Sequence, residues 1–191
     1  TLSTYRAQKR GGKGRAAMSI KDEDFIRQVF VLNTHDPVLF FTNTGIVYEL
    51  KVYKLPLGNP QAKGRPIINL LPLSEGEKVT TMMPLPENED NPPDLMFATR
   101  SGNVRRNPLS DFSNVKANGK IAMKLVEGDS LIGVVPCKKS DDIMLSASLG
   151  KCMRFRSNDV RLFKGRGSIG VRGIRLKPED HVISISVLKH I

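Results

Sequence analysis

The chain has 191 residues, a net charge of +11, a sequence pI near 9.9 and 39% hydrophobic residues. This length and apolar content exclude an intrinsically disordered polypeptide and indicate a folded protein with its own core. The excess of cations indicates an anionic partner, which could be a nucleic acid, an anionic membrane or an acidic protein.

The cysteine and hydropathy patterns exclude further classes. Cys137 and Cys152 form no CxxC pair, and with three scattered histidines they are too few for a typical zinc site. No apolar run approaches the roughly 18 residues of a membrane span, and no signal-peptide segment is visible. We therefore expect a soluble cytoplasmic chain without a metal, a cofactor or a membrane contact.

The first feature along the chain is the stretch QKRGGKGR, residues 8–15, which holds four cations, three glycines and no acid. A flexible basic tail is one interpretation. The alternative is a tight turn whose small residues let the backbone of a polyanion come close. The segment DEDFIRQVFV, residues 22–31, then closes an incomplete first unit.

Three later segments repeat one phrase, in which an apolar run ends in a small polar residue and a glycine. The copies are DPVLFFTNTG (36–45), PDLMFATRSG (93–102) and DDIMLSASLG (141–150). Their apolar runs predict strands over Val38–Thr42, Leu95–Thr99 and Ile143–Ala147. Alternating segments follow each copy as GIVYELKV, GNVRRNPL and GKCMRFRS, and these also have the character of strands.

Two further phrases recur in each unit. One carries an acid, at Asp24, Glu77, Asp129 and Asp180, and predicts a repeated structural contact and not a catalytic set. Glu179 stands where the sister copies have Gly76 and Gly128, which leaves that turn open. The other phrase occurs as LSTYRAQKRGGKG (2–14), LSDFSNVKANGKI (109–121) and, more loosely, SNDVRLFKGRGSIG (157–170).

The repeat predicts the fold class. Its closing glycines are 57 and 48 residues apart, and no segment keeps a helical period for three turns. Units of this length with about four strands each are typical of propeller-type blades, and a flat β-sandwich would not need such regular repetition. We predict one all-β domain with about three and a half blades, at 1–35 (partial), 36–92, 93–140 and 141–191.

No motif indicates catalysis. GRGSIG, residues 165–170, fits GxGxxG, but a strand-like segment follows where a nucleotide-binding fold needs a helix. His35 and Asp36 stand where a turn opens the first apolar run, and no nucleophile is placed beside them. We therefore predict that this chain carries no enzymatic activity.

Cations recur in phase with the repeat. Residues 1–21 hold six cations and no acid, residues 100–120 hold five and one acid, and residues 151–175 hold eight and one acid. In a circular array such a position becomes one basic stripe on the rim. By contrast, residues 86–94 are acidic and proline-rich.

The sequence QKRGGKG resembles the glycine-rich basic box in the C-terminal domain of the A subunit of bacterial DNA gyrase. The phrases GRPIINLLPLSEGEKV, ATRSGNVRRNPLSDF, NGKIAMKLVEGDSLIGV and GIRLKPEDHVISI are similar too, so the resemblance covers essentially the whole chain. It implies a β-pinwheel, a propeller-like disc whose four-stranded antiparallel blades exchange strands. That domain usually has six blades, so closure of the disc by this chain is open.

The resemblance also implies a function, namely sequence-tolerant binding, bending and chiral wrapping of duplex DNA around a basic rim. The parent would be an ATP-dependent topoisomerase of A2B2 composition in the bacterial nucleoid, with its catalytic tyrosine and its ATPase outside this chain. Phosphate contacts must offset about 1–10 kcal/mol of bending energy. We predict that the DNA-binding residues are Gln8, Lys9, Arg10, Gly11, Gly12, Lys13, Gly14, Arg15, Arg65, Arg105, Arg106, Lys116, Lys120, Arg154, Arg156, Arg161, Lys164, Arg166 and Arg172.

Two alternatives to DNA wrapping stay open. The C-terminal domain of topoisomerase IV would bend DNA without a full wrap, although the intact box argues against it. A propeller that binds acidic proteins would use the same cations. Phe40, Phe41 and Phe97 lie in apolar runs and are expected in the core, so no set of stacking platforms favours single-stranded nucleic acid.

Overall fold

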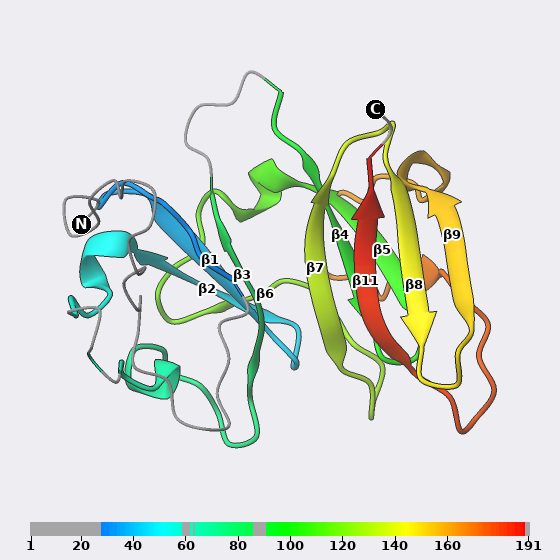
Figure 1. Ribbon diagram of the computed structural model, residues 1–191, viewed down its shortest axis with the longest axis horizontal. Coiled ribbons are helices and arrows are strands. Elements are labelled where there is room, and N and C mark those ends of the chain that lie inside the picture. The colour runs from blue at the N-terminus through cyan, green and yellow to red at the C-terminus, as the bar shows by residue number, and fades with distance from the viewer. Residues whose placement is uncertain (1–27, 59–61, 63, 86–90, 190–191) are drawn as a thin grey trace, which may run out of the picture.

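The computed structural model describes residues 28–58, 62, 64–85 and 91–189, and these residues form three antiparallel sheets (Figure 1). They contain no α-helix, which confirms the all-β prediction. Among them, no helix is long and apolar enough to cross a membrane. The short 3-10 helices are η2 (Val52–Lys54), η3 (Ile67–Asn69), η4 (Leu109–Phe112) and η5 (Ser157–Asp159).

Each sheet is built around the predicted opening strand of one repeat. The first sheet has the order β3-β1-β2-β6, the second β10-β5-β4-β7 and the third β11-β8-β9. The strands of the first sheet are β1 (Pro37–Thr42), β2 (Ile46–Lys51), β3 (Val79–Pro84) and β6 (Lys120–Ile121). Those of the second are β4 (Asp94–Thr99), β5 (Asn103–Pro108), β7 (Leu131–Cys137) and β10 (Val171–Arg172). Those of the third are β8 (Asp142–Ala147), β9 (Cys152–Arg156) and β11 (Val182–Leu188).

Neighbouring units exchange strands. The first two sheets take their outermost strands, β6 and β10, from the next unit along the chain, through the pairs Val47 with Lys120 and Val104 with Val171. The third sheet has three strands in the described residues. Four-stranded blades are therefore confirmed for the first two sheets. The predicted unit boundaries stay predictions, since each of these sheets draws on two units.

The innermost strands meet at Gly133 of β7. An added Cβ there would lie 3.2 Å from Ile185 Cγ2 of β11 and 3.6 Å from Thr81 Oγ1 of β3. The next amide, Val134 N–H, donates to Thr81 Oγ1 at 3.0 Å. Figure 1 shows β7 and β11 side by side. The strands β2, β5 and β9 and the exchanged β6 and β10 therefore form the outer edge, the term used below for this side of the molecule.

The core explains why the opening strands are apolar on both faces. Successive side chains of a strand point to opposite faces. Leu39 and Phe41 of β1 pack toward the second sheet, whereas Val38 and Phe40 pack in a separate cluster on the far face. The ring centroids of Phe41, Phe97 and Phe112 lie 5.6–5.7 Å apart in the interface between the first two sheets. The prediction that the phenylalanines belong to the core is confirmed.

The recurring acids make the predicted structural contact. Each accepts a hydrogen bond from the turn after the opening strand of its sheet: Glu77 from Thr44 Oγ1 at 3.1 Å, Asp129 from Ser101 Oγ at 2.6 Å and Asp180 from Ser148 Oγ at 2.9 Å. Asp24 lies outside the described residues. The turn assignment of Asp36 is also confirmed, since its carboxylate accepts from Asn33 N–H at 2.7 Å.

Candidate nucleic-acid interface

The basic loop, residues 163–170, lies against the outer edge of the second sheet. Its first residue donates from Phe163 N to Arg106 O at 2.8 Å, and directly after its last residue β10 pairs with β5. The strand β10 follows it, which confirms the prediction of a strand-like segment after GRGSIG. Both ends of the loop are attached to β5, and its middle is held by two side chains of the same strand.

Arg105 of β5 is one of these side chains, and it is fully buried. Its Nη1 donates to Arg166 O at 2.8 Å and to Ser168 O at 2.9 Å, and its Nη2 donates to Gly165 O. Burial lowers the pKa of Arg105 to about 10, and nearby Asp111 opposes this effect. The guanidinium is therefore charged at neutral pH and binds three carbonyl oxygens of the basic loop.

Asn107, also fully buried, completes this cradle. Its Oδ1 accepts from Arg105 Nε at 2.7 Å, and its Nδ2 lies 2.8 Å from Gly165 O and 3.1 Å from Phe163 O. Asn107 was not predicted from the sequence, because an isolated asparagine gives no signal of binding another segment. Arg105 and Asn107 are called the clamp below.

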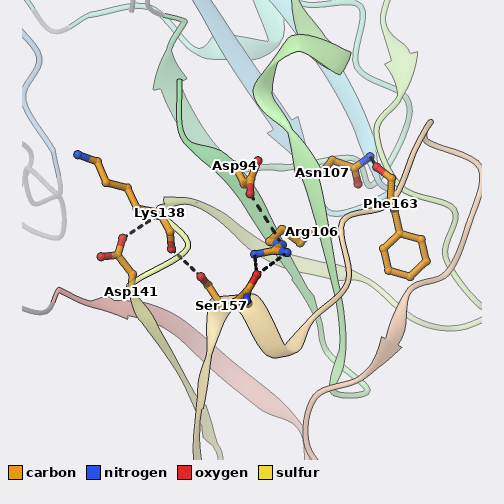
Figure 2. Close-up of polar contacts among 8 residues, drawn as sticks. Asp94, Arg106, Asn107, Lys138, Asp141, Ser157 and Phe163 are labelled. Carbon is orange, nitrogen blue, oxygen red and sulfur yellow. Dashed lines mark hydrogen bonds and ion pairs between the residues drawn. The ribbon is translucent and has the colours of Figure 1, made fainter. Parts of the chain in front are cut away.

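Arg106 is buried as well and connects the second and third sheets. Its Nε lies 3.8 Å from Asp94 Oδ2, and its two terminal nitrogens lie 3.4 and 3.5 Å from Asn158 Oδ1 of η5 (Figure 2). Nearby, Ser157 Oγ donates to Lys138 O at 2.6 Å. The inclusion of Arg105 and Arg106 in the DNA-binding set is thus corrected, because both guanidinium groups are turned into the protein.

The other predicted cations differ in exposure. Arg65, Lys116, Arg154, Arg156, Arg161, Lys164 and Arg172 are exposed, whereas Lys120 and Arg166 are partly buried. Several have partners on the protein: Arg154 Nη2 lies 2.6 Å from Asp142 Oδ2, Lys120 Nζ donates to Asn114 O at 2.6 Å, and Arg161 lies 4.3 Å above the Phe163 ring. The box residues 8–15 lie outside the described residues.

Two exposed cations within residues 151–175 were not in the predicted set. Lys151 Nζ donates to Arg175 O at 2.5 Å, which brings both residues to one place beside the third sheet. Both belong to the run of eight cations over residues 151–175, and this run was the sequence signal that could have identified them. The structure therefore extends the candidate surface around β9.

A cavity formed by the described residues is lined mostly by apolar residues. It has a volume of about 1140 Å³ and lies along the inner strands, and Asp36 is the one ionisable residue among those that line it. No group of three or more His, Cys, Asp or Glu residues is arranged for a metal in the described ranges. Burial raises the pKa of Cys137 to about 12, so its thiol is not a nucleophile at neutral pH.

Comparison with known families decides where this fold belongs. The sequence model of one family, described as DNA gyrase C-terminal domain, beta-propeller, matches residues 1–33, 36–86, 93–138 and 141–189. The chain belongs to the DNA gyrase C-terminal domain family. The resemblance and the propeller-like β-pinwheel fold predicted from the sequence are thereby confirmed.

Curated relatives agree with this membership. The chain is 56% identical over 192 residues to the A subunit of DNA gyrase from Rickettsia conorii, a match that covers 100% of the chain and 21% of the relative. It is 47% identical over 186 residues to the A subunit of DNA gyrase from Escherichia coli K12, covering 97% and 21%. The chain thus spans about a fifth of the length of these relatives.

Solved structures share the fold. A DNA gyrase A C-terminal domain matches with 28% identity and a TM-score of 0.67, over 99% of this chain and 60% of that one. The C-terminal domain of a DNA topoisomerase IV matches with 23% identity and a TM-score of 0.82, over 91% and 54%. The basic loop and its clamp therefore lie on a gyrase-type C-terminal domain.

Proposed function

We propose that this chain binds duplex DNA without sequence preference, and bends and wraps it with a fixed sign along the cations of the outer edge. The observation that supports this function best is the basic loop, which is held on the outer edge with Lys164 exposed and Arg166 partly exposed. Exposed cations that recur along the outer edge match the extended negative charge of a curved polyanion better than the charge of a compact ligand.

The physical basis is counterion release. Duplex DNA carries about one negative charge per 1.7 Å of its axis, so each phosphate neutralised by a lysine or arginine releases bound counterions. Such contacts supply affinity without reading the bases, as in the wrapping of DNA by histones. Glycines of the basic loop and of the box allow the protein backbone to come close to the phosphates.

We further propose that the chain works within a gyrase A subunit, together with a B subunit, in the cytoplasm and nucleoid of a bacterium. The chain itself would hold DNA, and the strand-passing chemistry would reside elsewhere in the enzyme. The membership of the family and the relatives that are A subunits of DNA gyrase support this assignment.

The wrap is tested by the linking number of a relaxed circular plasmid. The protein is added, a nicking-closing topoisomerase equilibrates the plasmid, and the linking number is read after the protein is removed. We expect a protein-dependent shift toward positive supercoils. The substitutions K9Q, R10Q and K13Q together should abolish the shift and flatten the salt dependence of binding.

A matched control removes the same charge elsewhere. Lys54, Lys78 and Lys177 are exposed and belong to no predicted contact, so K54Q, K78Q and K177Q together should preserve the shift. Absence of binding by the unmodified chain would contradict the proposal.

Bending without a wrap is the second candidate function. The observation that favours it is the higher TM-score to the topoisomerase IV domain. Tight binding with an unchanged linking number, combined with a bend measured by the migration of circularly permuted fragments, would support this candidate.

A further inference from the structure

The clamp does more than attach the basic loop to β5. A trans peptide unit is planar, with its C=O and N–H pointing in opposite directions. Arg105 binds the carbonyl oxygens of Gly165, Arg166 and Ser168 from the inside. The N–H groups of the same three peptide units, which belong to Arg166, Gly167 and Ile169, are therefore turned away from β5.

These three N–H groups are free for a ligand. Within the described residues, none of them donates to a backbone or side-chain acceptor. Gly167 is exposed and has no heavy atom within 4 Å of the position that a Cβ would occupy, so the approach to it is open. Outward-facing backbone N–H groups without a protein partner can donate to phosphate oxygens, and Lys164 and Arg166 on the same loop add positive charge.

Resting on the proposed function, we propose that the N–H groups of Arg166, Gly167 and Ile169, with the side chains of Lys164 and Arg166, contact phosphates of duplex DNA where it passes over the basic loop. Arg105 is the positioning residue of this site. It touches no DNA, and it orients the loop by holding the carbonyl side of the peptide units.

The equivalent positions of the other sheets support a specific role for Arg105. Counted from the turn glycines, Tyr48 and Met153 occupy the position of Arg105 in β2 and β9. The Tyr48 hydroxyl donates to the Glu77 carboxylate at 3.1 Å, and not to the loop that covers β2. The arginine thus occurs under the covering loop that carries KGRG, whereas the loop over β2 reads SNVKANG.

The test measures binding of a short duplex by the whole chain over a range of salt concentrations. Arg105→Met takes the residue of the sister position, and K164Q with R166Q removes the charges of the loop. We expect each change to weaken binding about tenfold and to reduce the log–log salt slope by about 1 to 2. In the K164Q and R166Q background, Arg105→Met should weaken binding further by only about twofold, because it acts through the same loop.

Arg106→Met is the matched control. It removes the neighbouring buried arginine of β5, which contacts Asp94 and Asn158 and no carbonyl of the basic loop. We expect it to lower stability and leave the salt slope unchanged. Arg105→Lys, which retains the charge and can donate to carbonyls, should restore part of the affinity.

Amide hydrogen exchange of the unmodified chain provides a readout that no variant can confuse by failing to fold. DNA should slow exchange at Arg166, Gly167 and Ile169, and this protection should disappear in a folded Arg105→Met variant. Unchanged exchange at these amides in the DNA complex would overturn the inference, as would unchanged affinity and slope for a folded Arg105→Met variant. Absence of DNA binding by the unmodified chain would overturn the proposed function as well.

Discussion

The carboxylate of Glu77 shows how a buried acid can serve the fold. It is 7% exposed and accepts hydrogen bonds from Ser74 N–H at 2.9 Å and from the Tyr48 hydroxyl at 3.1 Å. Burial raises the pKa of Glu77, but the hydrogen bonds from Ser74, Thr42, Tyr48 and Thr44 together outweigh burial and lower it. The ionised form is therefore favoured in the folded state.

Glu77→Gln should lower the free energy of unfolding at pH 7 by about 1–3 kcal/mol, because it removes charged hydrogen bonds in a buried site. A depressed pKa contributes stability above the unfolded pKa, near 4.5, which is lost as the pH falls through the folded pKa. The difference between wild type and variant should thus shrink below about pH 4.5. Urea unfolding at several pH values measures this difference in stability.

Glu75→Gln is the control for this prediction. Glu75 is exposed in the same turn, so its substitution should change stability by less than about 0.5 kcal/mol at every pH. A constant difference between wild type and Glu77→Gln across the pH range would contradict the electrostatic account.

The structure shows the conformation of the turn at Glu179, which the sequence left open. The hydrogen bond from Glu77 N to Ser74 O recurs as Asp180 N to Lys177 O, both at 3.1 Å. Gly76 has φ +76°, whereas no described non-glycine residue has a positive φ. Pro178 precedes Glu179, and proline followed by a residue of negative φ is typical of a type I turn. The repeat thus keeps its hydrogen bond and changes its turn type.

At the scale of elements, the exchanged strand β10 depends on Gly170. This glycine has φ +89°, and a Cβ there would collide with Val104 O of β5. A side chain would therefore be strained both by the backbone conformation and by the contact. The close approach lets β10 pair with β5 and closes the outer edge of the second sheet.

Gly170→Ala should lower the free energy of unfolding by about 1–3 kcal/mol. Gly167→Ala in the same loop has no neighbour within 4 Å and no positive φ, so it should cost less than about 0.5 kcal/mol. Denaturant unfolding compares the two variants. Equal losses of unfolding free energy in the two variants would show that the loop, and not the strand exchange, limits stability.

At the scale of the whole molecule, positive charge is unevenly distributed over the units. Residues 36–92 hold five cations and seven acids, whereas residues 141–191 hold ten cations and five acids. A polyanion is attracted to the second of these segments and repelled by the first. We therefore expect DNA to contact the third sheet and its loops more extensively than the first.

Arg172→Gln should reduce the salt slope of duplex binding by about 1, as the loss of one phosphate contact does. Lys54→Gln removes one charge from an exposed residue of the acidic unit that belongs to no predicted contact, so it should change the slope by less than about half a unit. Salt titrations of both variants measure this. A larger effect of Lys54→Gln would contradict the expected DNA path.

The local pattern of the chain was sufficient for most of the fold. The opening strands β1, β4 and β8 were predicted within one residue of their bounds, because a strand buried on both faces is a continuous apolar run between turn residues. The family and the propeller-like class followed from repeated phrases. These signals are local or recur at a fixed spacing, so they can be identified from the sequence alone.

The directions of Arg105 and Arg106 could not be obtained in this way. Arginines are mostly exposed, and next to a basic run they were predicted to meet DNA. The acceptor of Arg105 in Gly165 lies 60 residues further along the chain, and that of Arg106 in Asn158 lies 52 residues further. Packing of the next unit over β5 decides which way the two guanidinium groups point, because a guanidinium covered by another segment must find its acceptors there.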